Sequence, residues 1–349
     1  MVFYLFIWFF LFLLAICELY KCSVSNKITF FIAVLLLLLF AGLRYGIETD
    51  YWAYYRIFNL EKQRGIEPGF NLLIDLYKTY ISQSFDGFIF IVALLSISIK
   101  YFFFKDTASP FWGLLIYYSL FYILFEYNII RQGLAASFLL IASNYAKKKQ
   151  GLKFFVFVVI ASTFHISSVL FMPVYFFATR SLFIRDVFVL IFLAFSICLF
   201  LYPVINLLLL TITEIINQPI LHSYIKRLTS YLSADIEKFI SIGFMRRFVF
   251  VCLFIWLNGK KKISNIYFNI YMFGYILYIL FMGNAILSTR LSASFELFMA
   301  PMFAVAIKER VFTWKSVYVS GIISFVLLLL YITVLINGDA IPYQTFINL

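Results

Sequence analysis

Charged side chains that could bind phosphate or move a proton lie at the end of an early apolar run. The stretch "LRYGIETDYWAYYRIF" places Arg44, Glu48 and Asp50 directly after a series of leucines, and Tyr54 follows them. A guanidinium binds phosphate oxygens through paired hydrogen bonds, and a carboxylate can take a proton from a hydroxyl group. These residue types therefore suit a transfer reaction in which a phosphate group carries the developing charge.

A second polar group interrupts a later apolar region in "EYNIIRQGLAA". Asn128, Arg131 and Gln132 are spaced so that one continuous α-helix would carry them on a single face. An arginine about one turn below a membrane surface could simply extend its side chain to the interface. The shared polar face favours the lining of a site instead.

His165 is one of only two histidines, and it lies in "STFHISSVLFMPVYF" between two short apolar segments. A histidine in such a place is often a hydrogen-bonded structural residue. The expected helix break next to it favours a functional ring that could act as a general base. Glu67, in "EPGFNLL", is a further acidic residue expected at the same level.

The second half of the chain contributes two more charged groups, in "GFMRRFVFVCLFIW" and "ILSTRLSASFELFMAP". Arg246 and Arg247 point about 100° apart on a helix, so both cannot face lipid, and at least one is expected to face a cavity. Arg290 and Glu296 could form a structural pair, although a spacing of six is poor for a bridge along one helix.

Together these residues suggest one site at the outer boundary of the membrane, where several guanidiniums would hold a lipid-linked diphosphate. The possible bases are Asp50, Glu48 and His165, and the arginines are Arg44, Arg131 and Arg290, with Arg246 and Arg247 as further substrate contacts. No cofactor and no metal are expected, although "ETD" could alternatively be a DxD-like metal site. The nearby tyrosines and tryptophan suit the faces of sugar rings.

The composition shows which elements must hold these residues. The chain of 349 residues is 64% hydrophobic and 13% charged, whereas a soluble domain is about 45–50% apolar and about 25% charged. We therefore expect an all-α polytopic membrane protein with a single transmembrane domain over 1–349. The twelve expected spans are 2–20, 28–43, 85–104, 110–127, 128–146, 153–164, 165–178, 184–204, 240–257, 264–284, 290–307 and 316–336.

Charge asymmetry predicts the orientation of these spans. The net charge of +12 falls on one set of connections, marked by "KKKQGLK" and "GKKK", and this side is expected to be cytoplasmic. Both termini and the two long loops, 44–84 and 205–240, would then lie outside and cover the site. Within the first loop, about 67–82 is expected to form a helix in the outer interface. The basic charge indicates contact with anionic lipid, not with nucleic acid.

Four motifs in order carry a resemblance: "LRYGIETDYWAYYRIF", "EPGFNLL", "NIIRQGLAASFLL" and "FHISSVLFMPVYF". Over roughly residues 30–180 the chain resembles the EpsG-type bacterial exopolysaccharide and O-antigen polymerases, the Wzy-like group. The resemblance implies a glycosyltransferase of the bacterial inner membrane, with its active site facing the periplasm or the outside. It would move a growing glycan from undecaprenyl diphosphate onto a lipid-linked repeat unit, supplied by a flippase and controlled by a chain-length regulator.

The family pattern extends to individual positions, namely Arg44, Asp50, Tyr54 and Glu67 in the first loop, Asn128, Arg131 and Gln132 in the second motif, and His165 in the third. Two other functions are open at this point. One is an O-antigen ligase or a GT-C type polyprenyl-phosphate glycosyltransferase. The other is a polysaccharide-unit flippase or transporter, although its charges should line both halves of the membrane, and here they gather in the outer half.

Overall fold

The structure is a computed structural model that describes residues 1–48, 50–59, 67–215, 242–259, 264–308, 316–337 and 343–345. These residues form helices and no strand, apart from an isolated antiparallel bridge between Arg44 and Thr345. The all-α expectation is therefore confirmed. Among the described helices, Val2–Leu19 and Phe85–Phe104 are long and apolar enough to cross a membrane, with a third span if one broken helix pair is counted together. The number of twelve spans stays a prediction.

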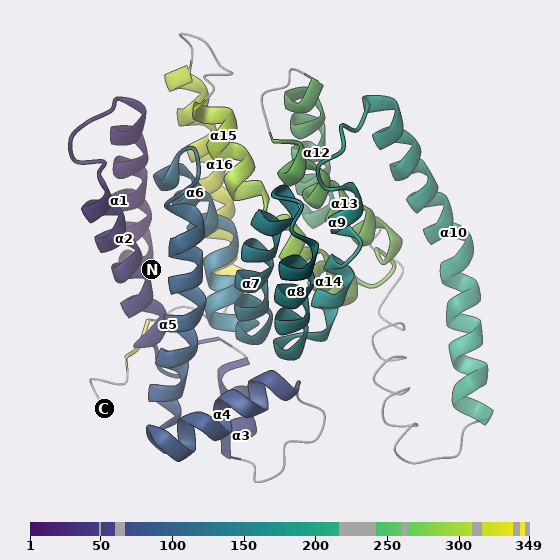
Figure 1. The fold of residues 1–349 in the computed structure, drawn as a ribbon, viewed down its shortest axis with the longest axis horizontal. Coiled ribbons are helices and arrows are strands. Elements are labelled where there is room, and N and C mark those ends of the chain that lie inside the picture. The colour runs from purple at the N-terminus through teal and green to yellow at the C-terminus, as the bar shows by residue number, and fades with distance from the viewer. Residues whose placement is uncertain are drawn as a thin grey trace. The chain divides into compact units, whose positions relative to one another are not determined.

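The chain contacts divide the molecule into two compact units, and each is described by itself. Unit 1 comprises Met1–Phe177 and Met299–Leu349. Its helices are α1 (Val2–Leu19), α2 (Lys27–Gly42), α3 (Asp50–Asn59), α4 (Pro68–Tyr80), α5 (Phe85–Phe104), α6 (Pro110–Tyr117), α7 (Ile130–Lys147), α8 (Gly151–Phe164), α9 (Val174–Phe177), α15 (Met299–Lys308) and α16 (Ser316–Asn337). Within this unit α7 packs along α8, and α5 packs against α2 and α7 (Figure 1).

The expected interfacial helix is present as α4. Pro68 occupies its first turn, where the missing N–H costs no hydrogen bond, and Glu67 precedes it as the N-cap. Phe70, Ile74 and Tyr77 recur at helical spacing and are buried. They pack on α3 and on the start of α5, so that α3 and α4 lie together at one end of α5 (Figure 1). The position of α4 in the membrane interface stays a prediction.

The expected span 110–127 differs from the structure in its second half. After Tyr117 the chain continues as two π-helical stretches, η1 (Tyr118–Tyr122) and η2 (Leu124–Asn128), and α7 begins only after Ile129. Gly133 makes this break possible, because a Cβ there would collide with the carbonyl oxygen of Phe125. The prediction that Asn128 and Arg131 share a face of one helix is therefore wrong.

The expected break near His165 is confirmed. Helix α8 ends at Phe164, His165 adopts an extended backbone conformation, and a 3-10 helix, η3 (Ile166–Phe171), follows it. The expected span 290–307 also proves to be broken. Its residues belong to α14 (Ala285–Glu296) and α15, which are separate helices.

Unit 2 comprises Ala178–Phe298. Its described helices are α10 (Ile184–Ile215), α12 (Ile242–Gly259), α13 (Asn265–Leu280) and α14. Helix α13 packs against α10, α12 and α14. Helix α10 continues beyond the expected end at 204, so 205–215 is helix and not loop. The rest of the expected outer loop, 216–240, lies outside the described residues.

Candidate functional site

Three residues singled out from the sequence meet at the N-terminus of α4. Glu67 forms an ion pair with Arg131 through its Oε2 atom, and its Oε1 atom lies 3.2 Å from Nδ1 of His165. The side chains of Glu67, Arg131 and His165 are 14%, 23% and 18% exposed, so all three are partly buried and still reach solvent. A carboxylate, a guanidinium and an imidazole are therefore in direct contact at a partly open position.

A close approach of two helices brings these residues together. A Cβ on Gly69 would collide with Oγ1 of Thr163 and would lie 2.9 Å from the carbonyl oxygen of Thr163. Glycine at this position therefore lets the first turn of α4 rest on the last turn of α8. His165 follows that last turn directly, and Glu67 precedes the first turn of α4, so the packing places the carboxylate beside the imidazole.

Tyr54, on α3, lies beside these three residues. The four residues Glu67, Arg131, His165 and Tyr54 are called the Glu67 cluster below. Its ring is almost fully buried and lies under Arg131, whose Cζ is 5.8 Å from the ring centroid. Burial raises the pKa of the Tyr54 hydroxyl, and the charge and hydrogen bond of Arg131 oppose that shift. Asp50 lies one helical turn before Tyr54 on α3, and its charge raises the same pKa further.

The electrostatics of the cluster keep Glu67 ionised. Burial alone would raise the pKa of its carboxyl group, but the hydrogen bond with His165 and the charge of Arg131 together lower that pKa below its ordinary value. An ionised carboxylate can only accept a hydrogen bond, so Nδ1 of His165 donates to it. The tautomer is thereby set, and Nε2 is the ring nitrogen that can take up a proton.

Arg44 lies elsewhere in unit 1 and is fully buried. Its Nη2 donates to the carbonyl oxygen of Tyr127 at 3.3 Å, and its Cζ lies 4.6 Å from the centroid of the Tyr127 ring. The backbone beside it pairs with the C-terminal segment, where the N–H of Tyr45 donates to the carbonyl oxygen of Gln344 at 3.0 Å. The described contacts of Arg44 are therefore with the buried Tyr127 and not with the Glu67 cluster.

The remaining unit 1 positions from the sequence analysis are Glu48, Asn128 and Gln132. Glu48 is buried and has a positive φ of 70°, an unusual backbone conformation for a residue other than glycine. Asn128 ends η2 and is partly buried, whereas Gln132 is almost fully buried in the first turn of α7. Arg131, between these two residues, forms the ion pair with Glu67.

Unit 2 contains a separate charged group. Glu296 on α14 accepts from Nε of Arg247 at 2.6 Å, and its other oxygen lies 3.8 Å from Nη2 of Arg246. Arg247 also lies over the ring of Tyr278, with 4.1 Å between its Cζ and the ring centroid. Two guanidiniums share one carboxylate, so the group keeps a surplus positive charge. Arg290 is exposed on α14, the helix that also carries Glu296.

The sequence left open which arginine pairs with Glu296. The structure pairs Glu296 with the two adjacent arginines, which explains how both can sit on an apolar helix. The expected convergence of Arg290, Arg246 and Arg247 with Arg131 involves both units and stays a prediction.

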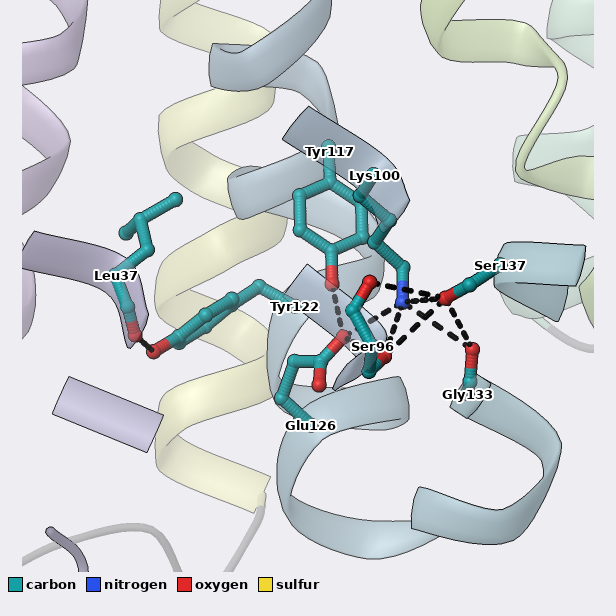
Figure 2. Close-up of polar contacts among 8 residues, drawn as sticks. All are labelled: Leu37, Ser96, Lys100, Tyr117, Tyr122, Glu126, Gly133 and Ser137. Atoms are coloured by element: carbon teal, nitrogen blue, oxygen red, sulfur yellow. Dashed lines mark hydrogen bonds and ion pairs between the residues drawn. The ribbon is translucent and has the colours of Figure 1, made fainter. Parts of the chain in front are cut away.

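Sequence reasoning missed one polar group in unit 1. Lys100, near the end of the expected span 85–104, forms a buried ion pair with Glu126 at 2.8 Å. Figure 2 shows its side chain among hydroxyl groups from neighbouring helices. The available signal was Ser96, one helical turn before Lys100 in a mostly apolar span.

The cluster consists of groups that bind anions and transfer protons. Within the part of the chain that the structure describes, no group of three or more His, Cys, Asp or Glu residues could hold a metal ion. The arrangement can therefore orient an imidazole, accept a proton at Nε2 and offer guanidinium N–H groups to an anion.

Comparison with known proteins gives one match. The sequence model of the EpsG family matches residues 27–345, a range that contains the Glu67 cluster and the charged group of unit 2. No curated protein and no solved structure matches the chain.

Proposed function

Because the chain belongs to the EpsG family, we propose that it is a polysaccharide polymerase of the O-antigen and exopolysaccharide type. Its substrates would be a glycan on undecaprenyl diphosphate and a second lipid-linked repeat unit. The observation that carries this proposal is the contact of Glu67 with both Arg131 and His165, which puts an oriented base beside a guanidinium.

In the proposed reaction, Nε2 of His165 takes the proton from the acceptor hydroxyl group. That oxygen attacks the anomeric carbon of the donor glycan, and the bond from this carbon to the diphosphate oxygen breaks. The diphosphate leaves with the electron pair and remains on its lipid. Glu67 stabilises the imidazolium that forms, as a carboxylate does next to a catalytic histidine. His165 is favoured as the base over Asp50 and Glu48 because Glu67 orients its ring through Nδ1, so that Nε2 can take up the proton.

Arg131 is the proposed contact for the leaving diphosphate. A guanidinium has five N–H donors, and Glu67 and Tyr54 use only part of them. The surplus charge at Arg246 and Arg247, together with the exposed Arg290, supports a role for unit 2 in binding diphosphate as well. Arg44 would act indirectly, by fixing the chain beneath the first loop.

The apolar helices and the family membership point to a membrane-embedded protein. We place it in the bacterial inner membrane, with the site and both termini outside, on the basis of the charge asymmetry in the sequence. A flippase would then supply the substrate, and a chain-length regulator would act on the product.

The test uses cells that depend on this protein for their surface glycan. Arg131→Ala and His165→Ala should each abolish long chains while single repeat units still reach the surface. Arg185→Ala is a matched control, because Arg185 is exposed and pairs only with its neighbour Asp186 among the described residues. A normal glycan ladder in both the Arg131 and the His165 variants would refute the proposal.

A further inference from the structure

A buried polar network connects α5 with both sides of the break that precedes α7 (Figure 2). Its ionic core is Lys100 on α5 and Glu126 on η2, each with a side chain only 2% exposed. Oε1 of Glu126 accepts from Nζ of Lys100 at 2.8 Å, from Oη of Tyr117 at 2.6 Å and from Oγ of Ser96 at 3.0 Å. This carboxylate is therefore held from two neighbouring elements.

The ammonium group of Lys100 also reaches across the break to α7. Its Nζ lies 2.7 Å from Oγ of Ser137 and 3.2 Å from the carbonyl oxygen of Gly133. Ser137 donates in turn to the same carbonyl at 3.0 Å. Lys100 therefore holds η2 and the start of α7 at once, although the regular helix is interrupted between them at Ile129.

Arg131 sits between the two attachment points. It lies after Glu126 and before Gly133, in the first turn of α7, where it contacts Glu67 and Tyr54. A shift of η2 relative to α7 would rotate that first turn. The position of the Arg131 guanidinium over the Glu67 cluster therefore depends on the network behind it.

We propose that Lys100 and Glu126 are positioning residues that hold the Arg131 guanidinium at the reaction site. The proposal rests on the function proposed above. A purely structural ion pair would keep the protein folded without setting the rate of each folded molecule. A positioning pair must change that rate, and it must do so through Arg131.

The first variants separate stability from positioning. Lys100→Met or Glu126→Gln alone leaves a buried charge without its partner, so both should lower the yield of folded protein. The double variant Lys100→Met/Glu126→Gln removes both charges and should regain folded protein. Its kcat for elongation should nevertheless stay about 10- to 100-fold below that of the wild type, because a displacement of about 1 Å is enough for such a loss.

A double-mutant cycle then tests the route through Arg131. In an Arg131→Lys background, the Lys100→Met/Glu126→Gln change should lower the residual kcat by less than about twofold, because residues that act through one another are not additive. Ser137→Ala should lower kcat, whereas Ser143→Ala should not, because Ser143 on the same helix bonds only to Leu140 among the described residues.

Three outcomes overturn the inference. A double variant with wild-type kcat per folded molecule would show that the network is structural. If the double change lowered kcat by the same factor in the Arg131→Lys background as in the wild type, the network would act through a residue other than Arg131. If Arg131→Lys itself kept full activity, the proposed role of Arg131 would fail first and this inference with it, so the two failures can be distinguished.

Discussion

Replacing Glu67 with glutamine removes the charge that connects Arg131 to His165, while the length of the side chain stays the same. A hydrogen bond to a charged group contributes about 1.5–3 kcal/mol, and about 1.4 kcal/mol corresponds to a tenfold change in rate. The loss of the oriented contact to His165 would then cost about 10- to 150-fold in kcat/KM. Because the three side chains are 14–23% exposed, water weakens the interaction, and we expect a value near the lower end.

The assay is elongation of a lipid-linked repeat unit by purified Glu67→Gln protein, with folded protein measured in parallel. Asp75→Asn is the matched control, since it removes one carboxylate charge from an exposed position of the same helix, α4. A Glu67→Gln variant that keeps more than half of the wild-type kcat/KM would refute the reasoning, because a histidine without its carboxylate would then serve equally well.

Three further predictions concern the charge and the packing around the two clusters. The lowered pKa of Glu67 means that its contribution to stability is complete above the ordinary carboxyl pKa of about 4.3 and disappears as the pH falls through the folded-state value. The difference in thermal unfolding temperature between wild type and Glu67→Gln should therefore shrink between about pH 6 and about pH 3, and an unchanged difference would contradict this. Gly69→Ala should destabilise the protein by about 1–3 kcal/mol and lower its activity, because the added methyl group collides with α8, whereas Gly321→Ala, which meets no atom within 4 Å, should be silent in both assays. Glu296→Gln should lower the free energy of unfolding by about 3 kcal/mol, because Arg247 would lose its buried partner; a denaturant titration with no shift in midpoint would argue against that pairing.

The sequence indicated the main parts of the candidate site, because polar residues in apolar segments are rare and need a reason to be there. Glu67, Arg131 and His165 were all singled out, and the structure brings them into contact. Their pairing could not be derived, since it depends on Gly69 allowing α4 to approach α8. Nothing in the sequence marks this glycine as a contact between two helices.

Helix breaks limited the prediction of the fold. The turn at His165 was expected from its polar neighbours, but the π-helical stretch before Ile129 has no comparable signal, and Asn128 was therefore assigned to the wrong helix. Lys100 was not singled out, because a lysine near the end of an apolar span can extend its side chain to the interface. Its partner, Glu126, lies far away in the sequence, and only the tertiary structure identifies it.

Elongation of glycan in detergent tests whether the Glu67 cluster carries out glycan transfer. Detergent leaves no compartment to cross, so any lengthening must come from catalysis and not from transport. Purified wild-type protein and Arg185→Ala should convert lipid-diphosphate-linked repeat units into a ladder of longer glycans, and His165→Ala should not. Equal ladders from His165→Ala and the wild type, or no elongation by the wild type with intact substrate, would contradict the account.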